Sequence, residues 1–308
     1  MIHVQKIQTL TGHRDCVYTL ERGEKQNQFF SGAGDGMIVL WDLQTFERPV
    51  TPDHEGDLIA KLPNSVYALH YLSDQNLLIA GHNYDGIHLL DWKAKKELNS
   101  LQLGKAAIFD IQSFQNDLFV ASGDGTISVV DIQNWIVKKK IIRSDKSART
   151  IAINERQGEL AVGYSDHCIR VFSLDDYKLK AEWKAHENSI FCLAYSNDSN
   201  ILISGSRDAR LKAWDATSGY SKAGEVAAHL YAINHLEFSP NGKHFVTCSL
   251  DKSIKVWDFD NLKLLKVIDK ARHAGHGTSV NKLLWTSFND HLISASDDRT
   301  VSVWNIIF

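Results

Sequence analysis

Short runs of apolar residues alternate with turn residues along the whole chain, and the pattern repeats. The clearest copy is the segment 202–215, LISGSRDARLKAWD, in which two apolar runs flank a polar turn. The seven copies end at Trp41-Asp42, Leu90-Asp91, Val130-Asp131, Phe172-Ser173, Trp214-Asp215, Trp257-Asp258 and Trp304-Asn305. Successive copies lie 40 to 49 residues apart. A period of this length indicates one supersecondary unit repeated seven times.

Each period contains four short runs rich in Val, Ile, Leu and aromatic residues. In the fifth copy these runs are Ile190–Tyr195, Ile201–Gly205, Leu211–Asp215 and Lys222–Ala227. Turn clusters such as Gly34-Asp35-Gly36 separate them, as expected of strands. No stretch of ten or more residues has a convincing helical period. The pattern predicts an all-β fold, a seven-bladed β-propeller of four-stranded antiparallel blades.

The copies resemble the WD-repeat family, and the resemblance covers essentially the whole chain. The matching residues are Gly12-His13, Ala185-His186, Ala228-His229 and Gly275-His276 at the beginnings of copies, with Trp-Asp or its substitutes at the ends. The resemblance implies a single domain over residues 1–308. It also implies a non-catalytic scaffold that binds other proteins.

The seventh copy ends at Phe308, before a fourth strand. The opening segment Ile2–Leu10 precedes Gly12-His13 just as Tyr177–Lys184 precedes Ala185-His186. We therefore expect the N-terminal segment to complete the last blade as its outer strand. Such closure buries the apolar faces of all blades and leaves only short edges.

In the family, a His, a Ser or Thr, an Asp and a Trp form a hydrogen-bonded set inside one blade. Four copies carry the complete set: His13, Ser31, Asp35 and Trp41; His186, Ser204, Asp208 and Trp214; His229, Thr247, Asp251 and Trp257; His276, Ser294, Asp298 and Trp304. Hydroxyl, imidazole and carboxylate also serve nucleophilic catalysis. Four repetitions in one chain favour an architectural role, so no catalytic residue is assigned.

Copies two, three and four lack the set together. Apolar or small residues replace it: Leu62, Gly104 and Ser144 for His; Ala80, Val120 and Val162 for the hydroxyl; Leu90, Val130 and Phe172 for Trp. Exchanging a whole buried set for apolar packing can be almost neutral, whereas removing one member strands its partners. In copy two Tyr84 takes the place of the turn Asp, which displaces Asp85 by one position.

The resemblance places the recognition surface at the mouth of the central channel. In each copy one residue is expected there, the one that directly follows the first apolar residue of the first strand. These residues are Tyr18, Tyr67, Phe109, Arg149, Phe191, Asn234 and Asn281. Arg207, in the turn before a third strand, joins them. Aromatic residues and Arg are enriched at protein interfaces, although the rings can equally fill the channel neck. The two guanidiniums suit a carboxylate of a partner, or each pairs with a neighbouring Asp.

Composition and charge narrow the partners. The chain is 44 % hydrophobic and 23 % charged, with a formal charge of −3, so we expect a folded protein that binds neither nucleic acid nor membrane. No secretory or membrane-spanning stretch is seen, which predicts a cytoplasmic location. The cysteines Cys16, Cys168, Cys192 and Cys248 lack CxxC spacing and are expected to be reduced and buried. The chain is expected to be monomeric on its own or a subunit of a complex.

Two longer connections and the cofactor question complete the sequence picture. The segment 46–56 is an insertion expected on the face opposite the mouth, and residues 269–277 form a basic connection on the mouth face that is suited to partner contact. His273 and His276 invite a zinc hypothesis, but no thiol or carboxylate ligand lies nearby in sequence. We expect no metal, and no phosphate-binding motif supports a nucleotide or other cofactor.

Three functions stay open on this basis. The first is a scaffold that captures a peptide or protein segment at the mouth. The second is a propeller enzyme or small-ligand binder acting in the channel, because fold does not fix function. The third is a structural subunit that uses the rim or the lower face. An enzyme should gather acids, bases or metal ligands at equivalent inward positions, whereas the mouth positions are mainly aromatic or amide.

Overall fold

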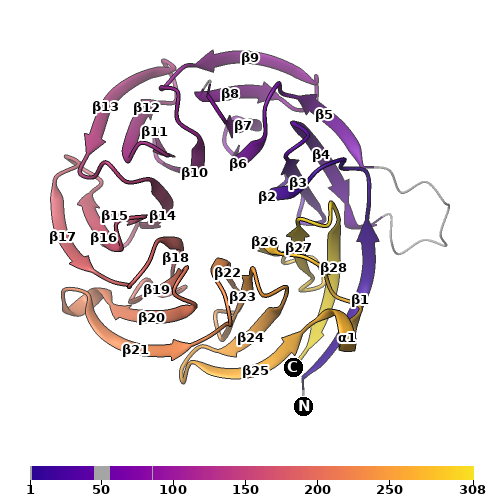
Figure 1. Cartoon of the computed structure of the whole chain (residues 1–308). Helices are drawn as coiled ribbons and strands as arrows, with labels where there is room; N and C mark the ends of the chain where they lie inside the picture. The colour runs from indigo at the N-terminus through magenta and orange to yellow at the C-terminus, as the bar shows by residue number, and fades with distance from the viewer. Residues whose placement is uncertain (1, 45–55, 85) are drawn as a thin grey trace.

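The computed structural model describes residues 2–44, 56–84 and 86–308. Most of the insertion expected at residues 46–56, and the turn residue Asp85, lie outside the described residues. The remainder forms seven four-stranded antiparallel sheets arranged in a ring (Figure 1). The predicted fold is therefore confirmed.

Blades 1 to 4 follow one another along the chain, each with strands a to d in order from the channel outwards. Blade 1 consists of β2 (Val17–Arg22), β3 (Gln28–Ala33), β4 (Met37–Asp42) and β5 (Asp57–Lys61). Blade 2 consists of β6 (Val66–Leu72), β7 (Leu77–His82), β8 (Gly86–Asp91) and β9 (Lys96–Leu101). Blade 3 consists of β10 (Ile108–Phe114), β11 (Asp117–Ser122), β12 (Thr126–Asp131) and β13 (Ile136–Ile142). Blade 4 consists of β14 (Ala148–Asn154), β15 (Glu159–Tyr164), β16 (Cys168–Ser173) and β17 (Leu179–Lys184).

The last three blades keep the same strand order. Blade 5 consists of β18 (Ile190–Tyr195), β19 (Ile201–Ser206), β20 (Arg210–Asp215) and β21 (Ser221–Ala227). Blade 6 consists of β22 (Ile233–Phe238), β23 (His244–Ser249), β24 (Ile254–Asp258) and β25 (Lys263–Ile268). Blade 7 consists of β26 (Val280–Trp285), β27 (Leu292–Ser296) and β28 (Val301–Ile307), with β1 (His3–Leu10) as its outer strand. The strands expected in blade 5 agree with these bounds to within one residue.

Burial along the strands explains their composition. The second strand of a blade is buried on both faces because a neighbouring blade covers each side, and in β15 every residue is buried. The outer strand faces solvent, as in β17, where half-buried and exposed residues alternate, and in β9, which is almost fully exposed. Continuous apolar runs therefore mark inner strands, and mixed polar runs mark outer strands.

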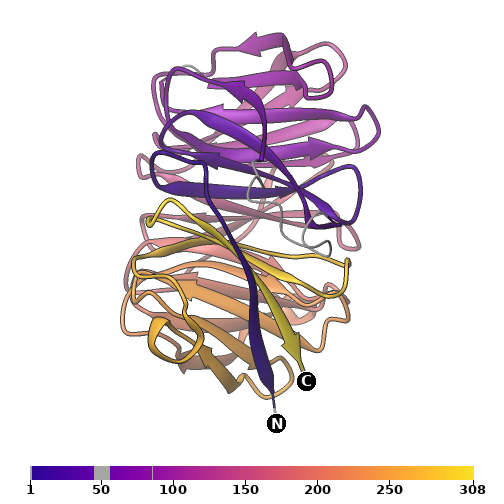
Figure 2. The same cartoon turned by 90° about the vertical axis from the view of Figure 1, so that its right-hand side faces the viewer.

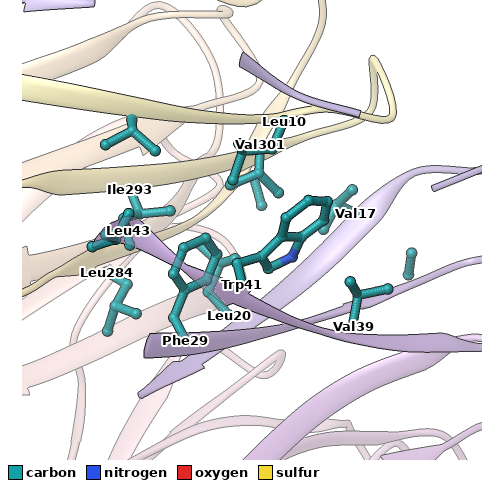
Figure 3. Close-up of a cluster of buried hydrophobic side chains, with 13 residues drawn as sticks. Leu10, Val17, Leu20, Phe29, Val39, Trp41, Leu43, Leu284, Ile293 and Val301 are labelled. Atoms are coloured by element: carbon teal, nitrogen blue, oxygen red, sulfur yellow. The ribbon is translucent and has the colours of Figure 1, made fainter. Parts of the chain in front are cut away.

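The hydrophobic core is divided among the interfaces between blades. Figure 3 shows the cluster between blades 1 and 7, where Phe29 and Trp41 of blade 1 pack against Leu284, Ile293 and Val301 of blade 7. Because each interface buries side chains from two blades, a blade alone would leave an apolar face in water.

The N-terminal strand closes the ring. In β1, Leu10 pairs with Val301, Lys6 with Trp304 and His3 with Ile307 of β28. The views of Figures 1 and 2 place both chain ends side by side on this blade. The predicted closure is confirmed, with the strand beginning at His3 rather than Ile2.

Two short helices were not anticipated from the sequence. The helix α1 (Lys270–His273) lies in the long connection to blade 7, and the Asp269 side chain caps it by accepting a hydrogen bond from the Arg272 N–H. The 3₁₀ helix η2 (Ala216–Ser218) follows β20 and is capped by Asp215. Both caps are the Asp type that satisfies the free N–H groups of a first turn.

Candidate partner-binding face

In blade 5 the four polar residues form one continuous hydrogen-bonded chain. The Trp214 indole N–H donates to Ser204 Oγ at 2.9 Å, and Ser204 Oγ lies 2.7 Å from His186 Nε2. Because an indole only donates, the serine accepts from it and gives its own proton to Nε2. His186 Nδ1 then donates to Asp208 at 3.0 Å. Ser204 is 0 % exposed, so this hydroxyl cannot meet a substrate.

The other three complete blades repeat this geometry. The hydroxyl to His Nε2 distance is 2.7 Å in blades 1 and 6 and 2.8 Å in blade 7. The Trp N–H to hydroxyl distances are 2.8, 2.9 and 2.9 Å in the same order. The His Nδ1 to carboxylate distances are 3.3, 2.8 and 2.8 Å. The repetition indicates a structural element that ties the loop before the first strand of a blade to its second and third strands.

Electrostatics favours an ionised carboxylate in blades 5, 6 and 7 and a neutral imidazole in blades 1 and 6. Burial opposes ionisation of Asp208, yet the hydrogen bonds from His186 and the Glu187 N–H hold its pKa well below the usual range. Burial likewise lowers the pKa of His229, against the pull of Asp251. A neutral His with Nδ1–H is the form that this hydrogen-bond chain needs.

Other polar side chains occupy the blades that lack the set. In blade 4, Arg170 on β16 pairs with Asp166 at 2.8 Å and with Glu182 at 2.7 Å. In blade 2, the rings of His82 and His88 stack with their Nε2 atoms 2.6 Å apart. Sequence reasoning expected mainly apolar replacement and missed both groups. The sequence did contain a signal, because Arg170 and His88 are titratable residues on third strands, which are mostly buried.

The seven mouth residues predicted from the repeat register come together around one depression of about 250 Å³. Four aromatic rings and one guanidinium follow one another around it. The centroids of Tyr18 and Tyr67 are 4.8 Å apart, and those of Tyr67 and Phe109 are 6.1 Å apart. The Arg149 guanidinium lies 4.1 Å from the Phe109 centroid and 5.3 Å from that of Phe191. These contacts give the mouth a rigid, amphipathic wall.

The two asparagines of the mouth connect neighbouring blades. Asn234 Nδ2 donates to Ser279 Oγ at 2.9 Å and to the Val280 carbonyl at 2.8 Å. Asn281 Nδ2 donates to the Val17 carbonyl at 3.0 Å and to Asp297 Oδ1 at 2.7 Å. The amide N–H groups of both asparagines are therefore engaged within the protein. We expect them to hold neighbouring blades in place rather than to bind a partner directly.

Arg149 and Arg207 form no ion pair with a carboxylate among the described residues. Arg149 Nε donates to Ser165 Oγ at 3.1 Å, while Arg207 is exposed on the turn between β19 and β20. Burial, together with the positive charge of Arg207, lowers the pKa of Arg149. The pairing with a neighbouring Asp that the sequence left open is not found. The two guanidiniums instead form a local positive site.

Below the mouth lies the central channel, with a volume of about 480 Å³. Its lining includes Glu21, Arg22, His235, Glu237 and Lys282, a group that sequence reasoning missed. Arg22 pairs with Glu237 at 2.8 Å, and burial raises the pKa of Glu21 to about 7. Across the described ranges, no three His, Cys, Asp or Glu side chains are grouped to hold a metal ion.

The structure also places the histidine and arginine of the connection before blade 7, and the four cysteines. His276 belongs to the polar set of blade 7, and Arg272 pairs with Asp269 at 2.6 Å. All four cysteines are free thiols. Cys192 and Cys248 are buried as expected, but Cys16 and Cys168 are only half-buried, because Cys16 precedes β2 in a loop and Cys168 begins β16.

These features define a seven-bladed β-propeller in which four blades repeat one internal hydrogen-bonding pattern. The chain belongs to the WD40 family. The model described as "WD domain, G-beta repeat" matches residues 4–42, 177–215, 221–258 and 268–305, which together make half of the chain. The matched segments contain the four complete polar sets, whereas blades 2 to 4 diverge. Members of the family generally work as protein-interaction scaffolds and are generally non-catalytic.

Similar proteins come from several eukaryotes. The chain is 24 % identical to the "66 kDa stress protein" of Physarum polycephalum over 87 % of its own length and 43 % of that protein. It is 24 % identical to "WD repeat-containing protein 1" of Xenopus tropicalis over 89 % and 44 %, respectively. For "Nuclear distribution protein nudF" of Emericella nidulans the identity is 25 % over 85 % and 64 %. The chain thus spans less than two thirds of each of these relatives.

Among solved structures, the WD40 β-propeller domain of Doa1 superimposes with a TM-score of 0.83 at 18 % identity, over 99 % of this chain and 97 % of that one. Identity this low supports the fold alone. Among the described helices, none has the length and apolar character that a membrane crossing requires.

Proposed function

We propose that the protein is a non-catalytic scaffold that binds a peptide or protein segment at the mouth of its central channel. Tyr18, Tyr67, Phe109, Arg149 and Phe191 provide the binding wall, positioned by Asn234 and Asn281, and Arg207 extends it. The observation that carries the proposal is the continuous series of contacts among four aromatic rings and Arg149 around an open depression. Large rigid side chains of this kind dominate binding energy in protein interfaces because little conformational entropy is lost on contact.

An enzyme acting in the channel is the second candidate, favoured by the half-buried charged side chains of Glu21, Glu237 and Lys282. A scaffold fits better because Arg22 and Glu237 already neutralise each other at 2.8 Å, and an activated nucleophile with an oxyanion site is not apparent among the described lining residues. The proposal places the protein in the cytoplasm, as a monomer or as a subunit of a complex.

The experiment is affinity capture from native lysate with the wild-type protein and with the double variant Phe109→Ala/Arg149→Ala. The matched control is Lys96→Ala/Leu98→Ala on the exposed outer strand β9, which removes a similar cation and apolar side chain away from the mouth. We expect the mouth variant to lose a partner that the control retains, with melting temperatures of both close to wild type. Capture that survives the mouth variant and is lost with the control would place binding on the rim and refute the proposal.

A further inference from the structure

Charge is distributed unevenly around the mouth. Arg149 and Arg207 lie on blades 4 and 5, whereas Asp15 and Asp297 lie on the loops of blades 1 and 7, across the ring (Figure 1). Both aspartates are held in place by hydrogen bonds, since Asp15 accepts from the Cys16 N–H and Asp297 from Asn281. The two arginines have no such anionic neighbour. A bound segment therefore meets two guanidiniums on blades 4 and 5 that form no ion pair with a described carboxylate.

An exposed apolar patch adjoins the positive side on blade 6. Leu230 is 83 % exposed, Tyr231 60 % and Leu250 50 %. Two hydrogen bonds fix the loops that carry these residues, because the Leu230 N–H donates to the Asp251 carboxylate and the Leu250 N–H donates to the Ala232 carbonyl. Single exposed apolar residues are ordinary, but three held together beside a binding mouth indicate an interaction surface.

The repeat geometry joins this patch to Arg207. In three blade pairs, the turn between the second and third strands accepts a hydrogen bond from a serine just before the first strand of the next blade: Ser65 to Gly34, Ser147 to Gly123 and Ser189 to Ser165. Arg207 occupies the same turn position in blade 5, and Ala232 is the corresponding residue of blade 6. Because Ala232 follows Leu230 and Tyr231 directly, we infer from the repeat that the turn carrying Arg207 lies next to the apolar patch.

We propose that Arg149, Arg207, Leu230, Tyr231 and Leu250, which we call the blade 4–6 surface, bind an internal acidic–apolar segment of a partner protein. An Asp or Glu carboxylate of the segment lies between the two guanidiniums, and the apolar residues that follow it pack on Leu230, Tyr231 and Leu250. This inference rests on the proposed function and specifies the chemistry of the partner.

Charge complementarity carries the choice of occupant. The like charges of Arg149 and Arg207 lie on adjacent blades and repel each other, and a carboxylate between them relieves that repulsion while it accepts hydrogen bonds from both. Arg149 is partly buried against Phe109 and Phe191, so its attraction for an anion is screened less than that of a surface arginine. A basic segment would be repelled by both guanidiniums. The two arginines therefore orient the segment, with its acidic residue over blades 4 and 5.

An internal segment fits better than a free C-terminus because the surface continues on both sides of the arginines. Phe109 and Tyr67 extend it in one direction, and Leu230 and Tyr231 extend it in the other. A chain that ended at the guanidiniums would use only one of these sides. Nucleic-acid phosphates also pair with Arg, but the chain carries a formal charge of −3, and the aspartates across the mouth would repel a polyanion.

The test uses a random linear peptide library displayed on phage through the peptide C-termini, so that no free terminal carboxylate is presented. The full-length protein is the bait, alongside Arg149→Gln/Arg207→Gln, Leu230→Ser/Leu250→Ser and the matched control Arg210→Gln, whose side chain pairs with Glu225 on the outer strand. We expect wild type and the control to select peptides in which Asp or Glu is followed by apolar residues. The double arginine variant should lose the acidic preference.

Synthetic, C-terminally amidated versions of the selected peptides then allow the contact to be measured. We expect Arg207→Gln and the peptide change Asp→Asn each to weaken binding by about tenfold, the usual size for one charged hydrogen bond. The two changes together should cost little more than one of them, because they remove the same contact. The variant Leu230→Ser/Leu250→Ser should weaken binding while the acidic preference remains.

Three results would overturn the inference. Peptides that depend on Phe109 and Arg149 but show no acidic preference would refute it and leave the proposed function standing. An absence of any peptide lost with Phe109→Ala/Arg149→Ala would count against both. Displacement of the peptides by a short single-stranded oligonucleotide at equal concentration would assign the guanidiniums to nucleic acid instead.

Discussion

The Tyr220 hydroxyl of blade 5 donates a hydrogen bond to the Glu159 carboxylate of blade 4 at 2.5 Å. Lys180 of blade 4 forms an ion pair with the same carboxylate, and the Tyr195 hydroxyl lies 2.6 Å from that of Tyr220. Glu159 is buried, so a hydrogen bond from the neighbouring blade helps to stabilise its carboxylate inside the protein. Polar contacts therefore join adjacent blades in addition to the apolar clusters between them.

We predict that Tyr220→Phe lowers the free energy of unfolding by about 1–3 kcal/mol, the cost of leaving a buried polar group short of a partner. The matched control is Ser221→Ala, next in sequence but exposed, which should change stability little. Urea titration followed by tryptophan fluorescence measures both. Equal stabilities of the two variants would show that the contact between blades 4 and 5 contributes nothing.

The polar sets predict a coupling that single substitutions do not reveal. In blade 5, His186→Leu alone removes the acceptor for the Ser204 hydroxyl and one donor to Asp208, and should cost about 1–3 kcal/mol. Adding Ser204→Val and Trp214→Phe reproduces the replacements found in the other blades, so the triple variant should cost clearly less than the sum of the three single variants. Thermal denaturation of the four variants checks this. Additive costs would mean that the residues act independently.

How much the sequence predicts depends on whether a residue's position follows from the repeat. The register of the copies places Phe109 and Arg149 side by side at the mouth, although they are 40 residues apart, because equivalent strands start at the same radius. The pairing of Arg170 with Asp166 and Glu182 was not predicted. This pairing depends on the path of one long side chain across its own sheet. The repeat spacing predicts where strands lie, but it does not predict the path of a side chain.

The same limit applies to the channel and to the connections. Glu21, Glu237 and Lys282 converge because three different first strands bring them to one axis, and the positions deeper in each strand were not compared across copies. The helix α1 occurs in one copy only, so repetition offered no guide to it. A local signal was present in Asp269, which stands where an N-cap residue is expected.

Stability should fall as the pH drops from about 6.5 towards 4, partly because of one buried histidine. Burial lowers the pKa of His70 to about 4, and its Nε2 lies 2.7 Å from Ser113 Oγ. An unfolded chain takes up this proton near its ordinary pKa of about 6.5, whereas the folded protein does so only near 4. The unfolded state therefore binds more protons in this window, and the loss reaches about 3 kcal/mol at its acidic end.

The variant His70→Gln keeps a donor for Ser113 but does not titrate. We expect its stability to fall less steeply over that pH window, by up to about 1.4 kcal/mol per pH unit. The exposed His3→Gln is the matched control and should follow wild type. Urea unfolding at several pH values compares the slopes. A slope unchanged by His70→Gln would show that this histidine is protonated in the folded protein as readily as in the unfolded chain.

Closure of the ring by β1 predicts that the first ten residues stabilise the whole molecule rather than one edge. Their removal exposes the apolar cluster between blades 1 and 7 to which Leu10 belongs, and also uncovers Trp304 of blade 7, which pairs with Lys6. Burial of a single side chain such as Leu10 contributes about 2–5 kcal/mol. The truncation should therefore lower the melting temperature by roughly 10 °C or more, with all blades unfolding in one transition.

Point variants test whether the loss of stability comes from the buried side chains of β1 or from shortening the chain. Leu10→Ala should reproduce part of the loss, whereas Thr9→Ala, on the same strand but exposed, should leave the melting temperature unchanged. Differential scanning calorimetry measures both the midpoint and the number of transitions. A truncated chain that melts at the wild-type temperature would mean that blade 7 is stable without its outer strand, because three strands and the neighbouring blades would then be enough to keep the ring intact.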